Sequence, residues 1–171
     1  RIEVTSEGEG RGATFTLALP IRPHRDEQHA ESTADATRTS SPALRGLRVL
    51  VIDDERDARE LVQAILADRG CEVTLASSVD EALALLDTRL PDVVLADISM
   101  PRRDGYDFIR ELRSRTSDRG GDLPAAALTA YARAEDKTRM LAAGYSLHVP
   151  KPIDPNELVD VVASLTQFRR A

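Results

Sequence analysis

Short apolar runs alternate with helix-forming segments along most of this chain, and this alternation limits its fold more than any other feature. Five runs lie at residues 49–52, 71–76, 93–96, 125–128 and 147–149. A continuous apolar run is typical of a strand that is covered on both faces. Strands separated by helices form parallel sheets with right-handed crossovers. The sequence therefore predicts a doubly wound α/β domain with a five-stranded parallel sheet and helices on both faces.

The segments between the runs have the periodicity and the end signals of helices. The first should end at Gly70, because glycine readily adopts the left-handed conformation that closes a helix. Helix starts are predicted at Ser78, with Glu81 completing a capping box, at Asp104 and at Asp154. The buried faces of the first and last helices are predicted to consist of Ala58, Leu61, Val62, Ile65 and Leu66, and of Leu158, Val161, Val162 and Leu165.

Two other zones precede this domain. Residues 2–6 and 14–19 alternate apolar and polar side chains around a glycine-rich stretch, which predicts a β-hairpin within residues 1–20. Residues 21–45 contain almost no large apolar side chain, so we expect a flexible linker there. The predicted organisation is a hairpin (1–20), a linker (21–45) and an α/β domain (46–168).

Composition narrows the functional classes. The formal net charge of −6 argues against binding to nucleic acid or to anionic membrane, because both would repel the chain. No apolar run could span a bilayer and no signal peptide is visible, so we expect a cytoplasmic location. The single cysteine, Cys71, is expected to be a buried small hydrophobic residue. Because the chain starts with Arg1 rather than methionine, we expect a piece of a longer protein.

Polar side chains follow four of the predicted strands directly. Asp53 and Asp54 come after the first, Asp97 after the third, Thr129 after the fourth and Lys151 after the fifth. In a doubly wound sheet the ligand site lies at the carboxyl ends of the strands, so these side chains should converge. Glu55 is interpreted as a first-turn acid that favours the helix dipole.

This set of groups suggests a particular chemistry. Clustered carboxylates repel one another, and an all-oxygen site favours Mg²⁺, with Mn²⁺ as a substitute. A carboxylate beside such an ion can attack a phosphoryl group and form an acyl phosphate. Lys151 and Thr129 would then stabilise the phosphoryl oxygens. Lysine is rare here, since only Lys137 and Lys151 among 23 basic residues are lysines.

The chain resembles the response-regulator receiver family of two-component signalling over residues 46–168. The resemblance lies in residues 49–55, in 94–101 with the Asp104-Gly105 pair, in 128–130 and in 149–152. It implies a flavodoxin-like sheet with strand order 2-1-3-4-5, and transfer of a phosphoryl group from a phospho-histidine of a kinase dimerisation or histidine phosphotransfer domain. The implied roles are phosphoacceptor (Asp97), metal ligands (Asp53, Asp54, Asp97 and the Ser99 backbone carbonyl), switch hydroxyl (Thr129) and phosphate-contacting lysine (Lys151).

Further features of that family concern the switch. The resemblance implies a cis peptide bond between Lys151 and Pro152. The residue three before the lysine is usually aromatic in the family, and here it is His148, which could be the switch residue or simply a surface histidine. Ser99 and Tyr131 occupy positions that tune the lifetime of the acyl phosphate in the family.

The hairpin region resembles the last hairpin of a histidine-kinase ATP-binding domain, over about twenty residues. Together the two resemblances imply a fragment of a hybrid sensor histidine kinase, whose parent can be membrane-anchored. The upstream nucleotide-binding motifs of that family are absent from this chain, so the chain itself is not expected to act as a kinase. Its own chemistry would be self-phosphorylation and self-dephosphorylation.

Two alternatives remain open. One is a phosphatase with an aspartate nucleophile, as in the haloacid-dehalogenase group, although residues 53–55 lack its Asp-x-Asp arrangement. The other is a degenerate receiver that is never phosphorylated and acts as a binding module. The presence of Asp53, Asp54, Asp97, Thr129 and Lys151 argues against that second interpretation.

Overall fold

A computed structural model describes residues 2–5, 8, 11–17, 44–130 and 134–168 of the 171-residue chain. The chain divides into two units, which are treated separately. In the first, strands β1 (Ile2–Thr5) and β2 (Thr14–Leu17) pair in antiparallel register, with Val4 opposite Phe15. This pairing confirms the predicted hairpin. Most of the predicted linker lies outside the described residues.

The second unit contains a five-stranded sheet in which every pair of neighbouring strands is parallel. The spatial order is β4-β3-β5-β6-β7, which is 2-1-3-4-5 when the strands of this unit alone are counted. The predicted topology is therefore confirmed. The strands are β3 (Arg48–Ile52), β4 (Glu72–Ala76), β5 (Val93–Asp97), β6 (Ala125–Thr129) and β7 (Leu147–Pro150).

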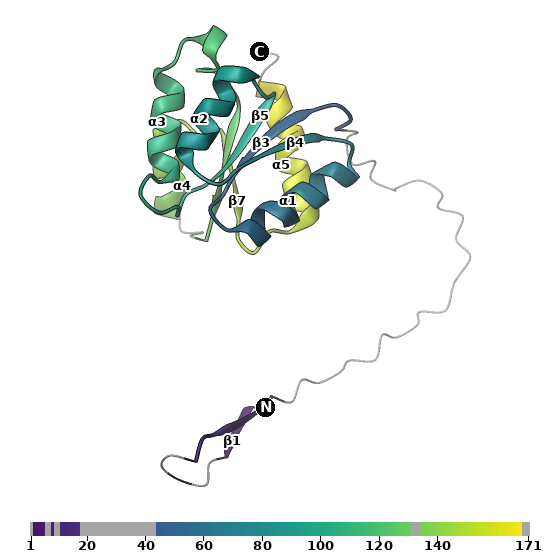
Figure 1. Ribbon diagram of the computed structural model, residues 1–171, viewed down its shortest axis with the longest axis vertical. Helices are drawn as coiled ribbons and strands as arrows, with labels where there is room; N and C mark the ends of the chain where they lie inside the picture. The colour runs from purple at the N-terminus through teal and green to yellow at the C-terminus, as the bar shows by residue number, and fades with distance from the viewer. Residues whose placement is uncertain (1, 6–7, 9–10, 18–43, 131–133, 169–171) are drawn as a thin grey trace, which may run out of the picture. The chain divides into compact units, whose positions relative to one another are not determined.

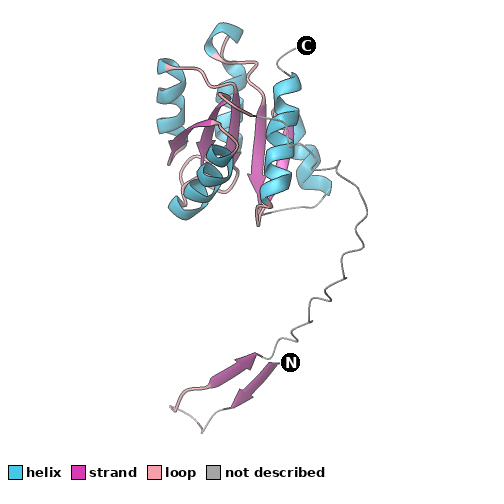
Figure 2. Ribbon diagram, turned by 90° about the vertical axis from the view of Figure 1, so that its right-hand side faces the viewer, coloured by secondary structure: helices cyan, strands magenta, loops and turns pink. Residues whose placement is uncertain are grey.

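Helices cover both faces of this sheet (Figures 1 and 2). One face packs against α1 and α5, and the other against α2, α3 and α4. The helices are α1 (Arg56–Asp68), α2 (Val79–Thr88), α3 (Gly105–Ser114), α4 (Ala134–Ala143) and α5 (Pro155–Phe168), with a 3₁₀ turn η1 at Ser117–Arg119. Because both faces are covered, the central strands β5 and β6 are buried along their whole length. Among the described residues, no helix is long and apolar enough to cross a membrane.

The helix ends largely follow the predicted capping. Asp104 and Asp107 form a reciprocal capping box at α3. Asp154 accepts hydrogen bonds from two amides of the first turn of α5. At α2, Ser78 accepts from the Glu81 amide as expected, but the Glu81 carboxylate bonds Ser77 instead of the Ser78 amide. The predicted capping box at Ser78 is thus wrong in one half, because the Ser77 amide and hydroxyl offer this carboxylate two donors.

Two predicted helix faces need correction. Leu61 was assigned to the buried face of α1, yet 49% of it is exposed, whereas Val62 and Leu66 are fully buried. In α5 the core position adjacent to Leu158 is taken by Val159, and Val161 is only partly buried. A helical pattern leaves the edges of an apolar stripe undefined, since the width of the contact depends on the neighbouring element.

The packed unit includes residues before its first strand. Leu44 is buried in the core on the α1 and α5 face, and the Gly46 amide donates to the Gly70 carbonyl. Gly70 has a φ of 84° and ends α1, as predicted. Cys71 is buried beside Leu44, and this burial raises the pKa of its thiol, in keeping with the expected apolar role.

Candidate functional site

Two buried carboxylates share one lysine at the carboxyl end of the sheet. Asp53 follows β3, Asp97 ends β5 and Lys151 follows β7. The Lys151 Nζ lies 2.8 Å from Asp53 Oδ2 and 2.8 Å from Asp97 Oδ1. The side chain of Asp53 is 1% exposed and that of Asp97 is 6% exposed. The structure thus brings together side chains that lie up to 98 positions apart in the sequence.

Backbone amides hold the remaining carboxylate oxygens. Asp53 Oδ1 accepts from the Glu55 amide at 2.9 Å, and Asp97 Oδ2 accepts from the Ser99 amide at 3.0 Å. Each carboxylate therefore has one oxygen fixed by its own loop and the other directed at Lys151. Such bonds fix the orientation of both acids before any ligand arrives.

A third acid completes the cluster. Oxygens of Asp53, Asp54 and Asp97 lie within 4.8 Å of one another, and Asp54 is exposed while the other two are buried. Three carboxylates facing a single ammonium leave an excess of negative charge. Oxygen donors in such a group suit a hard divalent cation, so these residues fit the Mg²⁺ expected from the sequence. They fit Zn²⁺ less well, because among the described residues the cluster consists of carboxylates alone, without a histidine or a thiolate.

Burial and ion pairing shift the pKa values of Asp97 and Lys151. Burial raises the pKa of Asp97, and this effect outweighs the hydrogen bond and the charge of Lys151, which act in the other direction. Burial lowers the pKa of Lys151, but hydrogen bonds to Asp53 and Asp97 more than compensate, so its pKa is raised. The surroundings therefore favour the charged form of Lys151 and disfavour the charged form of Asp97.

Three other predicted site residues lie in the described part of the chain. Thr129 is buried at the end of β6, and its carbonyl accepts from the Lys151 amide at 2.7 Å. Ser99 is exposed, and the bond between Lys151 and Pro152 is cis, as predicted. His148 is half-buried on β7. Tyr131 lies outside the described residues.

One residue of the site was missed by the sequence analysis. Arg59, in the first turn of α1, donates through Nη1 to the Asp53 carbonyl at 2.5 Å. A cation near the amino end of a helix opposes the helix dipole. The position of this arginine near the amino end of α1 was the feature of the sequence that could have indicated a specific contact for Arg59.

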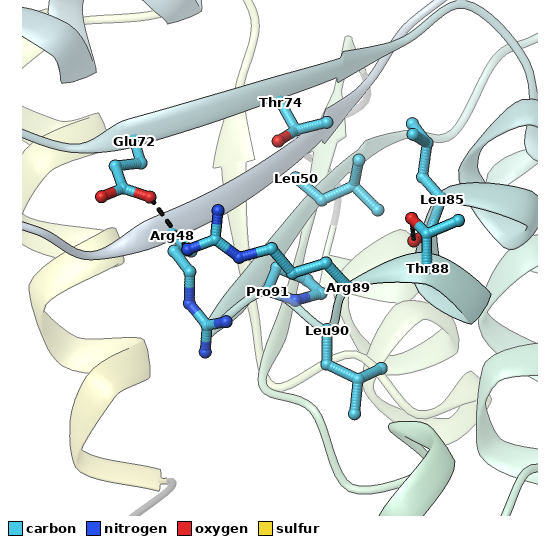
Figure 3. Close-up of a pocket in the computed structure, with 9 residues that line it drawn as sticks. All are labelled: Arg48, Leu50, Glu72, Thr74, Leu85, Thr88, Arg89, Leu90 and Pro91. Carbon is cyan, nitrogen blue, oxygen red and sulfur yellow. Dashed lines mark hydrogen bonds and ion pairs between the residues drawn. The ribbon is translucent and has the colours of Figure 1, made fainter.

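A separate hollow lies at the opposite end of the sheet (Figure 3). Leu50, Leu85, Leu90 and Pro91 form its apolar wall, and Arg48 and Arg89 stand at its rim. Both arginines already have carboxylate partners, because Arg48 pairs with Asp92 and Arg89 pairs with Glu72. We assign no function to this hollow.

Comparison with known proteins agrees with the fold. The family described as "Response regulator receiver domain" matches residues 49–163. Response regulator Rre1 of Synechocystis is 38% identical over 126 residues, which cover 73% of this chain and 54% of that protein. This chain therefore spans about half the length of that relative.

Solved structures give the same result. A putative response regulator from Chloroflexus aurantiacus is 30% identical, with a TM-score of 0.68 over 72% of this chain and 99% of that chain. The signal receiver domain of a signal transduction histidine kinase from Syntrophus aciditrophicus is 25% identical, with a TM-score of 0.65 over 71% of this chain and 91% of that chain.

The fold and the family match together define a signalling domain of the two-component class. The chain belongs to the response-regulator receiver family. This membership favours the receiver interpretation over an aspartate-nucleophile phosphatase.

Proposed function

We propose that this receiver domain accepts a phosphoryl group on Asp97. The observation that carries the proposal is the contact of Asp97 Oδ1 with Lys151 Nζ at 2.8 Å, beside the oxygens of Asp53 and Asp54. A nucleophile must be ionised and oriented, and the Ser99 amide and Lys151 hold the Asp97 carboxylate in one orientation. Two-component signalling supplies the phosphoryl donor, a phospho-histidine.

The proposed reaction is a direct transfer. An Asp97 carboxylate oxygen attacks phosphorus, a new P–O bond forms, the P–N bond to the donor imidazole breaks, and the ring nitrogen takes up a proton. Lys151 and Thr129 would stabilise charge on the phosphoryl oxygens, since a preorganised cation and a hydroxyl near developing charge lower the barrier.

Asp53, Asp54, Asp97 and the Ser99 carbonyl would hold Mg²⁺, or Mn²⁺ in its place. The bound cation would neutralise the phosphoryl oxygens during transfer. The excess negative charge of the three-carboxylate cluster supports this assignment. The chain's own contribution is to fix the two buried carboxylates through the Glu55 and Ser99 amides before the donor arrives.

Labelling with a small phosphodonor tests the proposal. The protein is incubated with acetyl phosphate and Mg²⁺, the acyl phosphate is trapped with borohydride, and the modified peptide is located by mass spectrometry. We expect a modification at Asp97 that depends on Mg²⁺ and is lost in Asp97→Asn. Label on another residue, or label that persists in the variant, would refute the assignment. Absence of label from the wild type would favour a non-phosphorylated binding module.

We also propose that Thr129 and His148 respond to phosphorylation. His148 pairs with Ala127, whose side chain packs on the α2, α3 and α4 face, so His148 faces the same layer. Thr129 lies two residues after Ala127 on the same strand and therefore on the same face. An inward movement of the Thr129 hydroxyl would open space toward His148. Ser99 and Tyr131 are proposed to tune how fast water removes the phosphoryl group.

The parent is proposed to be a hybrid sensor histidine kinase. The hairpin of β1 and β2 before the receiver supports this, as does the likeness to a receiver that is part of a histidine kinase. The hairpin (residues 1–20) would be the last part of the ATP-binding domain. A linker (21–45) and the receiver (46–168) would follow it. The complete coding sequence should then contain kinase nucleotide-binding motifs upstream of residue 1. A parent without them would refute this part of the proposal.

A further inference from the structure

A buried tyrosine connects the turn after α4 to the loop that follows Asp97. Tyr145 is 3% exposed and follows Gly144, which comes directly after α4. Its hydroxyl donates to the Gly105 carbonyl at 2.7 Å, across 40 positions of sequence. A buried phenol needs such a partner, because an unpaired hydroxyl in the core is costly.

Gly105 lies against the backbone of Asp97. A Cβ atom at Gly105 would stand 2.4 Å from the Asp97 carbonyl oxygen and 2.9 Å from Ile98 Cα, so no side chain fits there. The Gly105 amide also donates to the Ile98 carbonyl at 3.0 Å. The first residue of α3 and the backbone at Asp97 and Ile98 therefore cannot move independently.

The other end of this connection is also anchored. The Gly144 carbonyl accepts from Arg113 Nε at 3.0 Å and from Arg113 Nη2 at 2.8 Å. Arg113 Nη1 additionally donates to the Gly121 carbonyl at 2.7 Å. The peptide just before Tyr145 is thus held to α3 by charge-assisted bonds, which gives the tyrosine a fixed base.

We infer that Tyr145 is a positioning residue for the phosphoryl-acceptor loop. Its hydroxyl fixes Gly105, Gly105 fixes the backbone from Asp97 to Ile98, and that backbone leads into Ser99, whose amide and carbonyl belong to the proposed site. Tyr145 touches no reacting atom and acts through Gly105. The inference rests on the proposed function of Asp97 and extends it to a buried residue after α4.

The test compares two variants that each lose one phenolic hydroxyl. Tyr145→Phe keeps the ring and removes the hydroxyl that bonds Gly105. Tyr106→Phe removes a hydroxyl at the neighbouring position on α3 and keeps the ring over which the Arg139 guanidinium stacks at 4.6 Å. Each variant is titrated with Mg²⁺ by amide NMR and then phosphorylated with acetyl phosphate.

For Tyr145→Phe we expect shifted amide resonances at Ile98 and Ser99, and Mg²⁺ binding and phosphorylation each weakened about fivefold, the equivalent of one net hydrogen bond. Tyr106→Phe should resemble the wild type in all three measurements. Wild-type values in Tyr145→Phe, with unshifted loop resonances, would overturn the inference and leave a packing role only.

A second variant keeps the inference testable if Tyr145→Phe does not fold. Arg113→Gln weakens the anchor at the Gly144 carbonyl without touching the site, and it should shift the same Ile98 and Ser99 resonances. Unshifted resonances in a folded Arg113→Gln would count against the inference. If the wild type is not phosphorylated on Asp97, the proposed function fails, but the loop resonances still decide whether Tyr145 positions the loop.

Discussion

The two ends of the central sheet differ in the balance of their charged side chains. At the amino end, the Arg48 guanidinium donates two hydrogen bonds to the Asp92 carboxylate, which also accepts from the Arg48 amide. At the carboxyl end, Asp53 and Asp97 share a single lysine with the exposed Asp54 nearby. At the amino end the charges of Arg48 and Asp92 therefore offset each other, whereas the carboxyl end keeps an excess of negative charge.

This difference separates a structural ion pair from a functional one. A balanced pair needs no ligand. Ion pairs at the protein surface contribute roughly 0–1 kcal/mol to stability, and the Arg48–Asp92 pair is partly buried. Buried like charges raise the free energy of the folded state unless an opposite charge, such as a bound cation, offsets them. The excess negative charge at the carboxyl end is thus what distinguishes a ligand site from a structural ion pair.

The largest effect is expected from removing the shared lysine. Lys151→Met should reduce Mg²⁺-dependent phosphorylation by roughly 100-fold, because loss of one preorganised donor at a site of developing charge costs about that much. The measurement is the initial rate of acyl phosphate formation from acetyl phosphate.

Arg48→Met is the matched control at the amino end. It removes one cation from a pair 2.9 Å long and should lower the free energy of unfolding by about 1 kcal/mol while leaving the rate unchanged. Equal losses of rate in the two variants would mean that the two ends do not differ as argued.

Metal binding should give the second effect. At a Mg²⁺ concentration one hundred times its dissociation constant, the free energy of unfolding should rise by about 2.7 kcal/mol, since the cation binds only the folded cluster. Asp54→Ala should remove most of this gain. Denaturant unfolding with Mg²⁺ and with a chelator measures it.

Glu72→Gln is the control here, because Glu72 is an exposed acid paired with Arg89 at the amino end. Its Mg²⁺ stabilisation should equal that of the wild type. A gain that survives Asp54→Ala would place the cation elsewhere.

The smallest effect is the pH dependence of stability without metal. The pKa of Asp97 is raised by burial above its ordinary 3.8, so the folded state holds this proton more tightly than the unfolded state. Its contribution is complete below pH 3.8 and is lost as the pH rises through the folded-state pKa. In chelator, stability should therefore fall across that window, and Asp97→Asn should remove this component.

The pKa of Asp87 is shifted in the opposite direction to that of Asp97. A hydrogen bond from Arg119 lowers the pKa of Asp87, so its contribution is lost as the pH falls. Asp87→Asn should leave the Asp97 component intact. A pH profile that is identical in the wild type and Asp97→Asn would contradict the argument.

Much of this protein was determined by local sequence. The helix signals at Asp104 and Asp154 and the stop at Gly70 depend on residues within a few positions of one another, and the structure agrees with them. The strand order was implied by the resemblance to the receiver family, and the structure agrees with it too. The convergence of Asp53, Asp97 and Lys151 also follows from sequence, because parallel strands place their carboxyl ends at one edge.

Only the tertiary structure decided the contacts that join distant segments. Whether Leu61 or Val159 is buried depends on the neighbouring element rather than on periodicity. The bond from Tyr145 to Gly105 and those from Arg113 to Gly144 span 40 and 31 positions and follow no local pattern. Such contacts form because the packed core has to satisfy each buried polar group, and a one-dimensional pattern does not specify which partner lies within reach.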